Sequence, residues 1–245
     1  MQINAIKTHR IEPGESLKEI LDRYVMSISE RDILTITTKI ISICQSRIIK
    51  KNNISKKKLI KQEAEAVACV NESPYGIYLT IKNNILIPSA GIDESNGDGV
   101  YILYPENIQE TAVFIWNYLR NKYSITNFGV VITDSHTTPM RQGVTGICIG
   151  WCGFEPLYSY IGKPDIYNQP LKVTQINLLD ALATSSVLVM GEGNEQTPLA
   201  IISNAPKISF LSRPPTLDEI HSITIAMKDD LYAPLLMGVK WEYKL

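Results

Sequence analysis

Acidic residues with small polar neighbours are concentrated in segment 89–99, SAGIDESNGDG, which follows an apolar strand expected at 85–87. Three acids, serine and asparagine between glycines are poor core material. Their oxygens are the ligands that a hard cation prefers. A solvated Asp/Asn/Gly hairpin loop is the alternative, and composition alone favours that loop.

A second such segment is TDSHTTPMR at 133–141. Asp134 and Ser135 come directly after a strand expected at 130–133, where α/β architectures place ligand groups. Arg141 adds a planar guanidinium suited to phosphate or carboxylate. An Asp-Ser cap accounts for the first two residues equally well. His136 is a better candidate for chemistry than His221, which we expect on a helix face.

The third segment is MGEGNEQTP at 190–198, at the end of an expected helix. Gly191 can be a simple C-cap glycine, but a cap does not explain the further acids, the second glycine and the amides. A glycine-bearing loop with free backbone N–H groups could hold phosphate, with Glu192 on a metal. Because all three segments offer oxygen ligands and no paired His or Cys, they favour magnesium or manganese over zinc.

Standard nucleotide and hydrolase motifs are absent. The chain has no G-x-x-x-x-G-K-[ST], no G-x-G-x-x-G after a strand, no G-x-S-x-G and no H-E-x-x-H. Any nucleotide site must therefore be of a less common kind.

Helices and strands interleave without a regular βαβ alternation, which predicts an α+β fold of two subdomains rather than a doubly wound one. The clearest signals are apolar stripes and capping residues. They predict a helix that starts after Ser16, a strand at 32–38, a helix at 108–123, a strand at 130–133, a helix at 177–189 with Asn177 as its N-cap, and a helix with a capping box at Thr216 and Glu219.

Composition is that of an ordinary globular protein. The 245 residues are 44% hydrophobic and 20% charged, with a formal net charge of −1 and four scattered cysteines. We expect no nucleic-acid partner, no membrane span, no disulfide scaffold and a cytoplasmic location. The run 47–61 has seven cations and no acid. It is typical of a solvated face, and an anion-attracting rim beside a polyphosphate or polyglutamate site is the alternative.

Together, the three segments resemble the coenzyme F-420:gamma-glutamyl ligase family. The matching stretches are SAGIDESN, TDS followed by PMRQG, and LLDALATSSVLVMGEGNEQTPLA, with IGKPDIYNQPLKVTQ between them and EPGESL…TTKIIS near the start. They keep the family's order and spacing over most of residues 8–205.

This resemblance implies an α+β, two-subdomain fold of the F-420:gamma-glutamyl ligase type, neither Rossmann nor P-loop, that forms a homodimer. It implies an enzyme that uses GTP and a divalent metal, Mg or Mn. The enzyme attaches L-glutamate to a small-molecule carboxylate acceptor through an acyl phosphate.

Site residues carry over position by position. Asp93, Asp134, Ser135 and Glu192 match the metal-binding positions, and Asp134 and Arg141 are the expected catalytic residues. The nucleotide-contacting positions are Asn96, Met190, Gly191, Gly193, Asn194, Glu195, Gln196 and Thr197, with Thr8, His9, Arg10, Ile11, Thr38 and Lys39 from the N-terminal part. No residue is assigned as the base that deprotonates the glutamate amine.

Two departures from the family matter. Ile43 stands where the family carries a lysine that would contact phosphate. Segment 134–141, which bears on the acceptor, reads DSHTTPMR where coenzyme F-420 ligases read DTFGRPWR. This form is more similar to a bacterial branch labelled folate-type gamma-glutamate ligase, so the acceptor is folate-like or F-420-like. The alternative function is a non-catalytic nucleotide- or metabolite-binding protein on the same scaffold.

Overall fold

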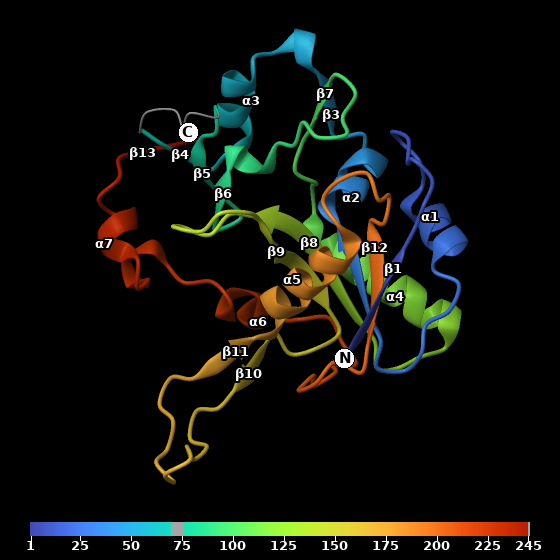
Figure 1. Ribbon diagram of the computed structural model, residues 1–245, viewed down its shortest axis with the longest axis vertical. Coiled ribbons are helices and arrows are strands. Elements are labelled where there is room, and N and C mark those ends of the chain that lie inside the picture. Colours follow the sequence, from blue (N-terminus) through green and yellow to red (C-terminus); the bar gives the residue numbers. More distant parts are fainter. Residues whose placement is uncertain (70–75, 245) are drawn as a thin grey trace.

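A mixed five-stranded sheet, which we call the large sheet, forms the centre of the molecule (Figure 1). The computed structural model describes residues 1–69 and 76–244. Only the central pair β2–β8 is parallel, and the other pairs are antiparallel. In spatial order the strands are β1 (Gln2–Ile6), β12 (Leu199–Ser203), β2 (Ile33–Thr37), β8 (Gly129–His136) and β9 (Thr145–Cys152).

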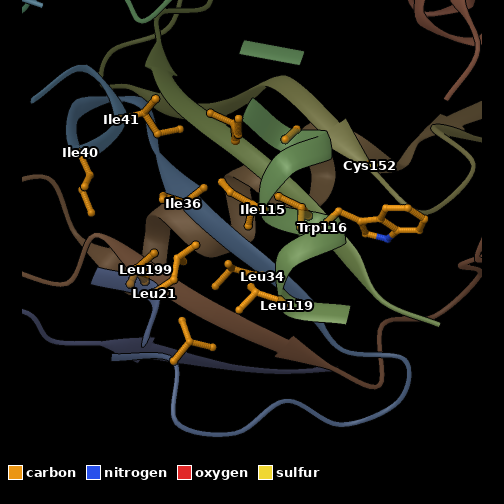
Figure 2. Close-up of a cluster of buried hydrophobic side chains, with 14 of the residues drawn as sticks. Leu21, Leu34, Ile36, Ile40, Ile41, Ile115, Trp116, Leu119, Cys152 and Leu199 are labelled. Carbon is orange, nitrogen blue, oxygen red and sulfur yellow. The ribbon is translucent and has the colours of Figure 1, made fainter. Parts of the chain in front are cut away.

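Alternation of side chains along β2 explains why helices cover both faces of the large sheet. Leu34 and Ile36 pack on one face against α1 (Leu17–Tyr24), α2 (Thr38–Cys44) and α4 (Ile108–Tyr123). Figure 2 shows this core, with Ile36 and Leu34 beside Ile115 and Leu119 of α4. Each such side chain contributes about 1.5–3 kcal/mol when fully buried.

The opposite face of the large sheet is covered by α5 (Leu178–Met190). Ile33 and Val131 point to this side and pack against Leu178 and Leu182. Since β2 and β8 are apolar on both faces, their ends are held firmly between two helical layers.

A second group of elements, built around what we call the small sheet, lies above the large sheet in Figure 1. The small sheet has the order β13-β4-β5-β6 and is antiparallel throughout. Its strands are β13 (Trp241–Tyr243), β4 (Ala66–Ala68), β5 (Leu79–Lys82) and β6 (Ile85–Pro88). Beside it lie α3 (Lys56–Glu63), the pair β3 (Ile48–Lys50) and β7 (Val100–Ile102), and 3-10 turns at Lys51–Asn53 and Ser89–Gly91.

Two further segments extend from this body (Figure 1). The strands β10 (Leu157–Ser159) and β11 (Gln175–Asn177) form a projecting arm. The C-terminal segment runs through α6 (Leu217–Ser222), a 3-10 turn at Met227–Asp229 and α7 (Ala233–Leu236), and ends as β13 at the edge of the small sheet.

The sequence-based expectations hold for the fold class and for most elements. The α+β fold is confirmed, and α1, α4 and α5 begin at the expected caps or stripes, with Ser16 and Asn177 as N-caps. The Thr216–Glu219 capping box is present on a short helix. No described helix is long and apolar enough to cross a bilayer. The subdomain boundaries stay a prediction.

Two expectations about strand ends are wrong. The strand expected at 32–38 ends at Thr37, because Thr38 starts α2, a helix the sequence did not predict. The strand expected at 130–133 continues to His136 as β8, paired with β9, so Asp134 and Ser135 lie within it. The register of this pair shifts between Ile132 and Thr133, and this bulge precedes Asp134.

Candidate functional site

A cavity of about 870 Å³ lies where the ends of β2 and β8 meet the loops beside the small sheet. Its size is within the range of small-molecule sites. Loops 8–13, 91–98 and 190–198 contribute to its lining, together with the start of α2. The cavity therefore joins segments that lie as far as 190 positions apart in the sequence.

Nearly all of the expected site residues line this cavity. Arg141 is the exception. It lies in the exposed loop between β8 and β9, and it is not among the residues that line the cavity. The lining includes Thr8, His9, Arg10, Ile11, Thr38, Lys39, Asp93, Asn96, Asp134, Ser135, Met190, Gly191, Glu192, Gly193, Asn194, Glu195, Gln196 and Thr197.

Asp134 projects from β8 into a poorly solvated part of the cavity. Burial raises the pKa of its carboxyl to about 7, against hydrogen bonds from the Ser135 N–H and the Thr38 hydroxyl, and nearby Asp93 adds to the rise. The Ser135 N–H lies 2.9 Å from Asp134 Oδ1. A carboxylate held in this way is stabilised by any cation that arrives beside it.

The pKa of Asp93 is shifted in the opposite direction to that of Asp134. Burial alone would raise its pKa, but the charge and hydrogen bond of Lys39, together with hydrogen bonds from Ser95, outweigh burial and hold the pKa below its usual value. Lys39 Nζ lies 2.7 Å from Asp93 Oδ2 and 2.9 Å from Ser95 Oγ. The backbone of Asp93 is fixed by two 2.9 Å hydrogen bonds with Ile102, so this carboxylate is anchored on the loop side of the cavity.

The glycine-bearing loop, residues 190–198, brings a third acid, Glu192, to the end of β8. Ser135 Oγ donates to Glu192 Oε1 over 2.7 Å. The loop itself is shaped by Glu195, whose carboxylate accepts a 2.8 Å hydrogen bond from the Gly193 N–H. Gly191, at φ +80°, ends α5 with its N–H on the Val187 carbonyl, so the C-cap interpretation is also correct.

Backbone and amide hydrogen bonds tie the three loops together across the cavity. The Asn96 side-chain amide donates to the Gly193 carbonyl over 3.1 Å. The Thr8 N–H donates to the Gln196 carbonyl over 2.8 Å. These bonds hold Asn96 of segment 89–99 and Thr8 of the N-terminal loop against loop 190–198.

The side chain of His9 anchors the N-terminal loop. Its ring nitrogens lie 2.6 Å from the Tyr24 hydroxyl and 2.9 Å from a Glu15 oxygen. Residues 8–13 line the cavity, and the His9 ring holds this loop in place through Tyr24 and Glu15.

Sequence reasoning missed two buried hydroxyls on the cavity wall. Tyr104 and Thr133 both line the cavity and are at most 2% exposed, and neither hydroxyl has a hydrogen-bond partner in the part of the chain that the structure describes. Burial, with Asp134 nearby, raises the pKa of the Tyr104 phenol, which stays neutral and able to donate. Tyr104 carries no sequence signal, because its role depends on distant neighbours.

The geometry of the turn Ser89–Gly91 explains why segment 89–99 has a glycine at position 91. Ser89, Ala90 and Gly91 all have positive φ, which is strained for the first two. A Cβ on Gly91 would overlap the ring of Tyr104. The glycine is thus required by close packing against Tyr104.

The basic run 47–61 is largely engaged in ion pairs. Lys51 and Lys56 both contact Glu94, at 2.7 and 2.5 Å, and Arg47 contacts Glu63 at 2.7 Å. None of these three cations lines the cavity. The solvated-face interpretation therefore describes the run better than an anion-attracting rim does.

The donor set suits a hard cation. Asp93, Asp134, Ser135 and Glu192 offer only oxygen, the set that Mg²⁺ and Mn²⁺ prefer. A positive charge already lies at the site, because the Lys39 ammonium contacts Asp93. In this arrangement, no group of three or more His, Cys, Asp or Glu among residues 1–69 and 76–244 converges closely enough to hold a metal.

Comparisons with known proteins identify the family of this chain. The family model described as F420-0:Gamma-glutamyl ligase matches residues 5–204. The coenzyme F420:L-glutamate ligase of Methanopyrus kandleri is 30% identical over 208 residues, which cover 78% of this chain and 82% of that protein. The protein of the same description from Methanococcus maripaludis is 31% identical with the same coverage. That from Methanosarcina mazei is 28% identical over 82% of this chain and 86% of its own length.

Proposed function

Because the chain belongs to the F420-0:gamma-glutamyl ligase family, and is thus a ligase that forms gamma-glutamyl amide bonds, we propose that it uses GTP and a divalent cation to join L-glutamate to the carboxylate of a small acceptor. One observation carries this proposal: a single cavity gathers all three acid-bearing segments.

An amide does not form directly between a carboxylate and an amine at neutral pH, so the acceptor must first be activated. In the proposed reaction an acceptor carboxylate oxygen attacks the γ-phosphorus of GTP, and GDP leaves. The glutamate amine then attacks the carbonyl carbon of the acyl phosphate, a proton is lost from nitrogen, and inorganic phosphate leaves. The overall products are the amide, GDP and phosphate.

The residues of the cavity suit the phosphoryl-transfer half of this reaction. Asp93, Asp134, Ser135 and Glu192 would supply oxygen ligands for Mg²⁺ or Mn²⁺, closing around the cation when it binds, and the cation would neutralise phosphate charge. Loops 8–11 and 190–197 place backbone groups along the same cavity, where they would position the nucleotide. Lys39 supplies a cation within reach of Asp93.

The other part of the cavity wall is apolar and would take the acceptor. Ile43, Ile87, Ile102 and Leu103 contribute to this wall. Such a surface suits a flat ring system, which folate-like and F-420-like acceptors share, so both stay in the proposal. Arg141 is proposed as a carboxylate or phosphate ligand from the exposed loop that follows β8.

The decisive experiment follows oxygen atoms. The protein is incubated with GTP, Mn²⁺, L-glutamate and each acceptor carrying ¹⁸O in its carboxylate. Transfer of one ¹⁸O into inorganic phosphate, together with a product heavier by one glutamyl residue, supports the proposal. GDP release without ¹⁸O transfer would contradict the acyl phosphate.

A non-catalytic nucleotide or metabolite binder is the second candidate. The observation that favours it is Ile43, which lines the cavity at the position where the family carries a lysine. Nucleotide binding that survives while no acceptor gives turnover would favour this candidate. The homodimer is likewise a proposal, and sedimentation equilibrium would test it.

A further inference from the structure

Lys39 occupies an unusual position for a lysine. It lies in the first turn of α2, which begins at Thr38 and has no acidic residue in that turn. The positive end of the helix dipole disfavours a cation there. Its side chain is only 28% exposed, so partners within the cavity must offset this disadvantage.

One of those partners, Asp93, is expected to bind the divalent cation. The ammonium lies 2.7 Å from Asp93 Oδ2 and 2.9 Å from Ser95 Oγ, and its charge also reaches Asp134. Asp93 and Asp134 in turn disfavour each other's ionisation. The positive charge of Lys39 lowers the pKa of both carboxyl groups, most directly that of Asp93, which its ammonium contacts.

The other lysine pairs on this loop show that the arrangement is specific. Lys51 and Lys56 hold Glu94, the next residue, at 2.7 and 2.5 Å, but neither lysine nor Glu94 lines the cavity. Adjacent carboxylates thus have lysine partners of two kinds, one outside the cavity and one within it. Of these three lysines, only Lys39 contacts a carboxylate that a bound cation would need.

We propose that Lys39 is the resident cation of the acidic site: its ammonium neutralises Asp93 until a divalent cation displaces it, and only then is it free for the nucleotide contact that the family resemblance implies for this residue. This inference rests on the proposed function, which supplies the cation and the nucleotide. Lys39 would thus be a ligand of the substrate in the loaded enzyme and a competitor of the metal in the free one.

Coupled binding follows from this exchange. A divalent cation that binds alone must displace the Lys39 ammonium from Asp93, and the ammonium is then left without a counter-charge. When GTP binds as well, its phosphates receive the ammonium, so each ligand favours the other by the same factor. Removing the lysine charge should therefore strengthen binding of the bare metal and weaken binding of the nucleotide, which are effects of opposite sign.

The test measures free Mn²⁺ by electron paramagnetic resonance during titration of the full-length protein, with and without guanylyl imidodiphosphate. K39M keeps the length of the side chain and removes its charge. We expect Mn²⁺ alone to bind about tenfold more tightly to K39M than to the wild type, which corresponds to about 1.4 kcal/mol. We expect the analogue to bind K39M more weakly, and the coupling between the two ligands to shrink.

Matched controls separate charge at this position from charge in general. K39R retains the cation and should bind Mn²⁺ alone no more tightly than the wild type. K51M removes a partner of Glu94 outside the cavity and should change Mn²⁺ binding by less than about twofold, because Lys51 pairs with Glu94 and not with Asp93. Circular dichroism and melting temperature establish that each variant is folded.

A second measurement needs no variant beyond one for assignment. In wild-type protein labelled with ¹⁵N-lysine, the Lys39 ammonium resonance should shift when Mg²⁺ is added, whereas that of Lys51 stays in place. K39R identifies the signal by its loss.

The outcomes are distinguishable. Tighter Mn²⁺ binding by K39M, with a shift of the Lys39 resonance, supports the inference. If K39M binds Mn²⁺ as the wild type does or more weakly, while D93N and D134N lose Mn²⁺, the role of Lys39 is overturned and the cation site stands. If D93N and D134N bind Mn²⁺ normally, the cation site of the proposed function fails, and this inference fails with it.

Discussion

The cavity has two unlike walls. One wall is the end of β8 with the starts of α2 and the glycine-bearing loop, set between two helical layers, and there burial raises the pKa of Asp134 to about 7. The other wall is segment 89–98, which depends on left-handed backbone and on the Lys39–Asp93 ion pair, and there the pKa of Asp93 is lowered. Two carboxylates of one site are therefore tuned in opposite directions, because packing dominates at one and a counter-charge at the other.

This difference indicates a division of labour. A residue in the packed wall has no alternative position, so its loss is not compensated. The loop wall is held by charge pairs and by contacts such as Asn96 to Gly193, which can rearrange when ligands bind. Each of the following predictions tests this contrast.

The largest effect is expected from D134N. An amide keeps the shape of the side chain but cannot offset the charge of a cation, so kcat/KM should fall by about 100-fold or more. Steady-state kinetics with GTP measure this fall. D93N should cost less, since the loop wall can adjust. Equal losses for the two variants, at unchanged melting temperature, would remove the contrast between the walls.

G91A should give the largest loss of stability. Its Cβ would overlap the Tyr104 ring, and its φ of +69° is unfavourable for alanine, so we expect a loss of about 2–4 kcal/mol in the free energy of unfolding. Urea denaturation measures it. The matched control is G99A, which has φ +82° but nothing within 4 Å of the new Cβ, and it should lose only about 1 kcal/mol. Equal losses would show that strain alone, and not packing against Tyr104, requires the glycine.

The pH dependence of the metal-free protein should reveal Asp134. Its pKa in the folded state, about 7, lies above the reference value of 3.8, so the folded state binds a proton more tightly than the unfolded state does. The contribution of Asp134 to stability is therefore fully present below about pH 4 and is lost as the pH rises through 7. Subtracting the melting temperatures of D134N from those of the wild type across this window isolates the slope. A flat difference would mean that Asp134 titrates as an exposed acid.

The smallest effect is expected at the two unpartnered hydroxyls. Y104F and T133V each remove a buried group without a partner, so the unliganded protein should become slightly more stable, by about 0.5–1 kcal/mol. Thermal denaturation of the free protein measures this gain. Destabilisation by either variant would show that its hydroxyl is satisfied in the folded protein and that this wall is not primed for a ligand.

Local signals made much of the fold predictable. The caps at Ser16, Asn177 and Thr216 and the stripe of α4 specify helices through short-range geometry, and the structure has them where the sequence placed them. The start of α2 was not predictable, because the residues 33–43 are almost uniformly apolar or β-branched. Such a run has no period to distinguish strand from helix, and only the change of packing after Thr37 decides it.

The acidic segments were also visible in the sequence, because clustered Asp, Glu and Gly have few structural uses. Their mutual contacts were not: Lys39 meets Ser95, Asn96 meets Gly193, and Ser135 meets Glu192, each pair at least 56 positions apart. Arg141 seemed equivalent to Asp134 in the sequence, yet it lies outside the cavity lining.

The sequence by itself thus determined the helices with caps and the class of fold, and it indicated the residues proposed to bind a cation and a nucleotide. Only the tertiary structure decided that these residues share one cavity and that Tyr104 lies near Asp134. It also decided that Asp134 is poorly solvated, whereas Asp93 is paired with Lys39. The physical reason is the separation along the chain over which each interaction acts. Capping and periodicity act over a few residues, whereas desolvation and charge pairing depend on whatever distant segments the packed core brings together.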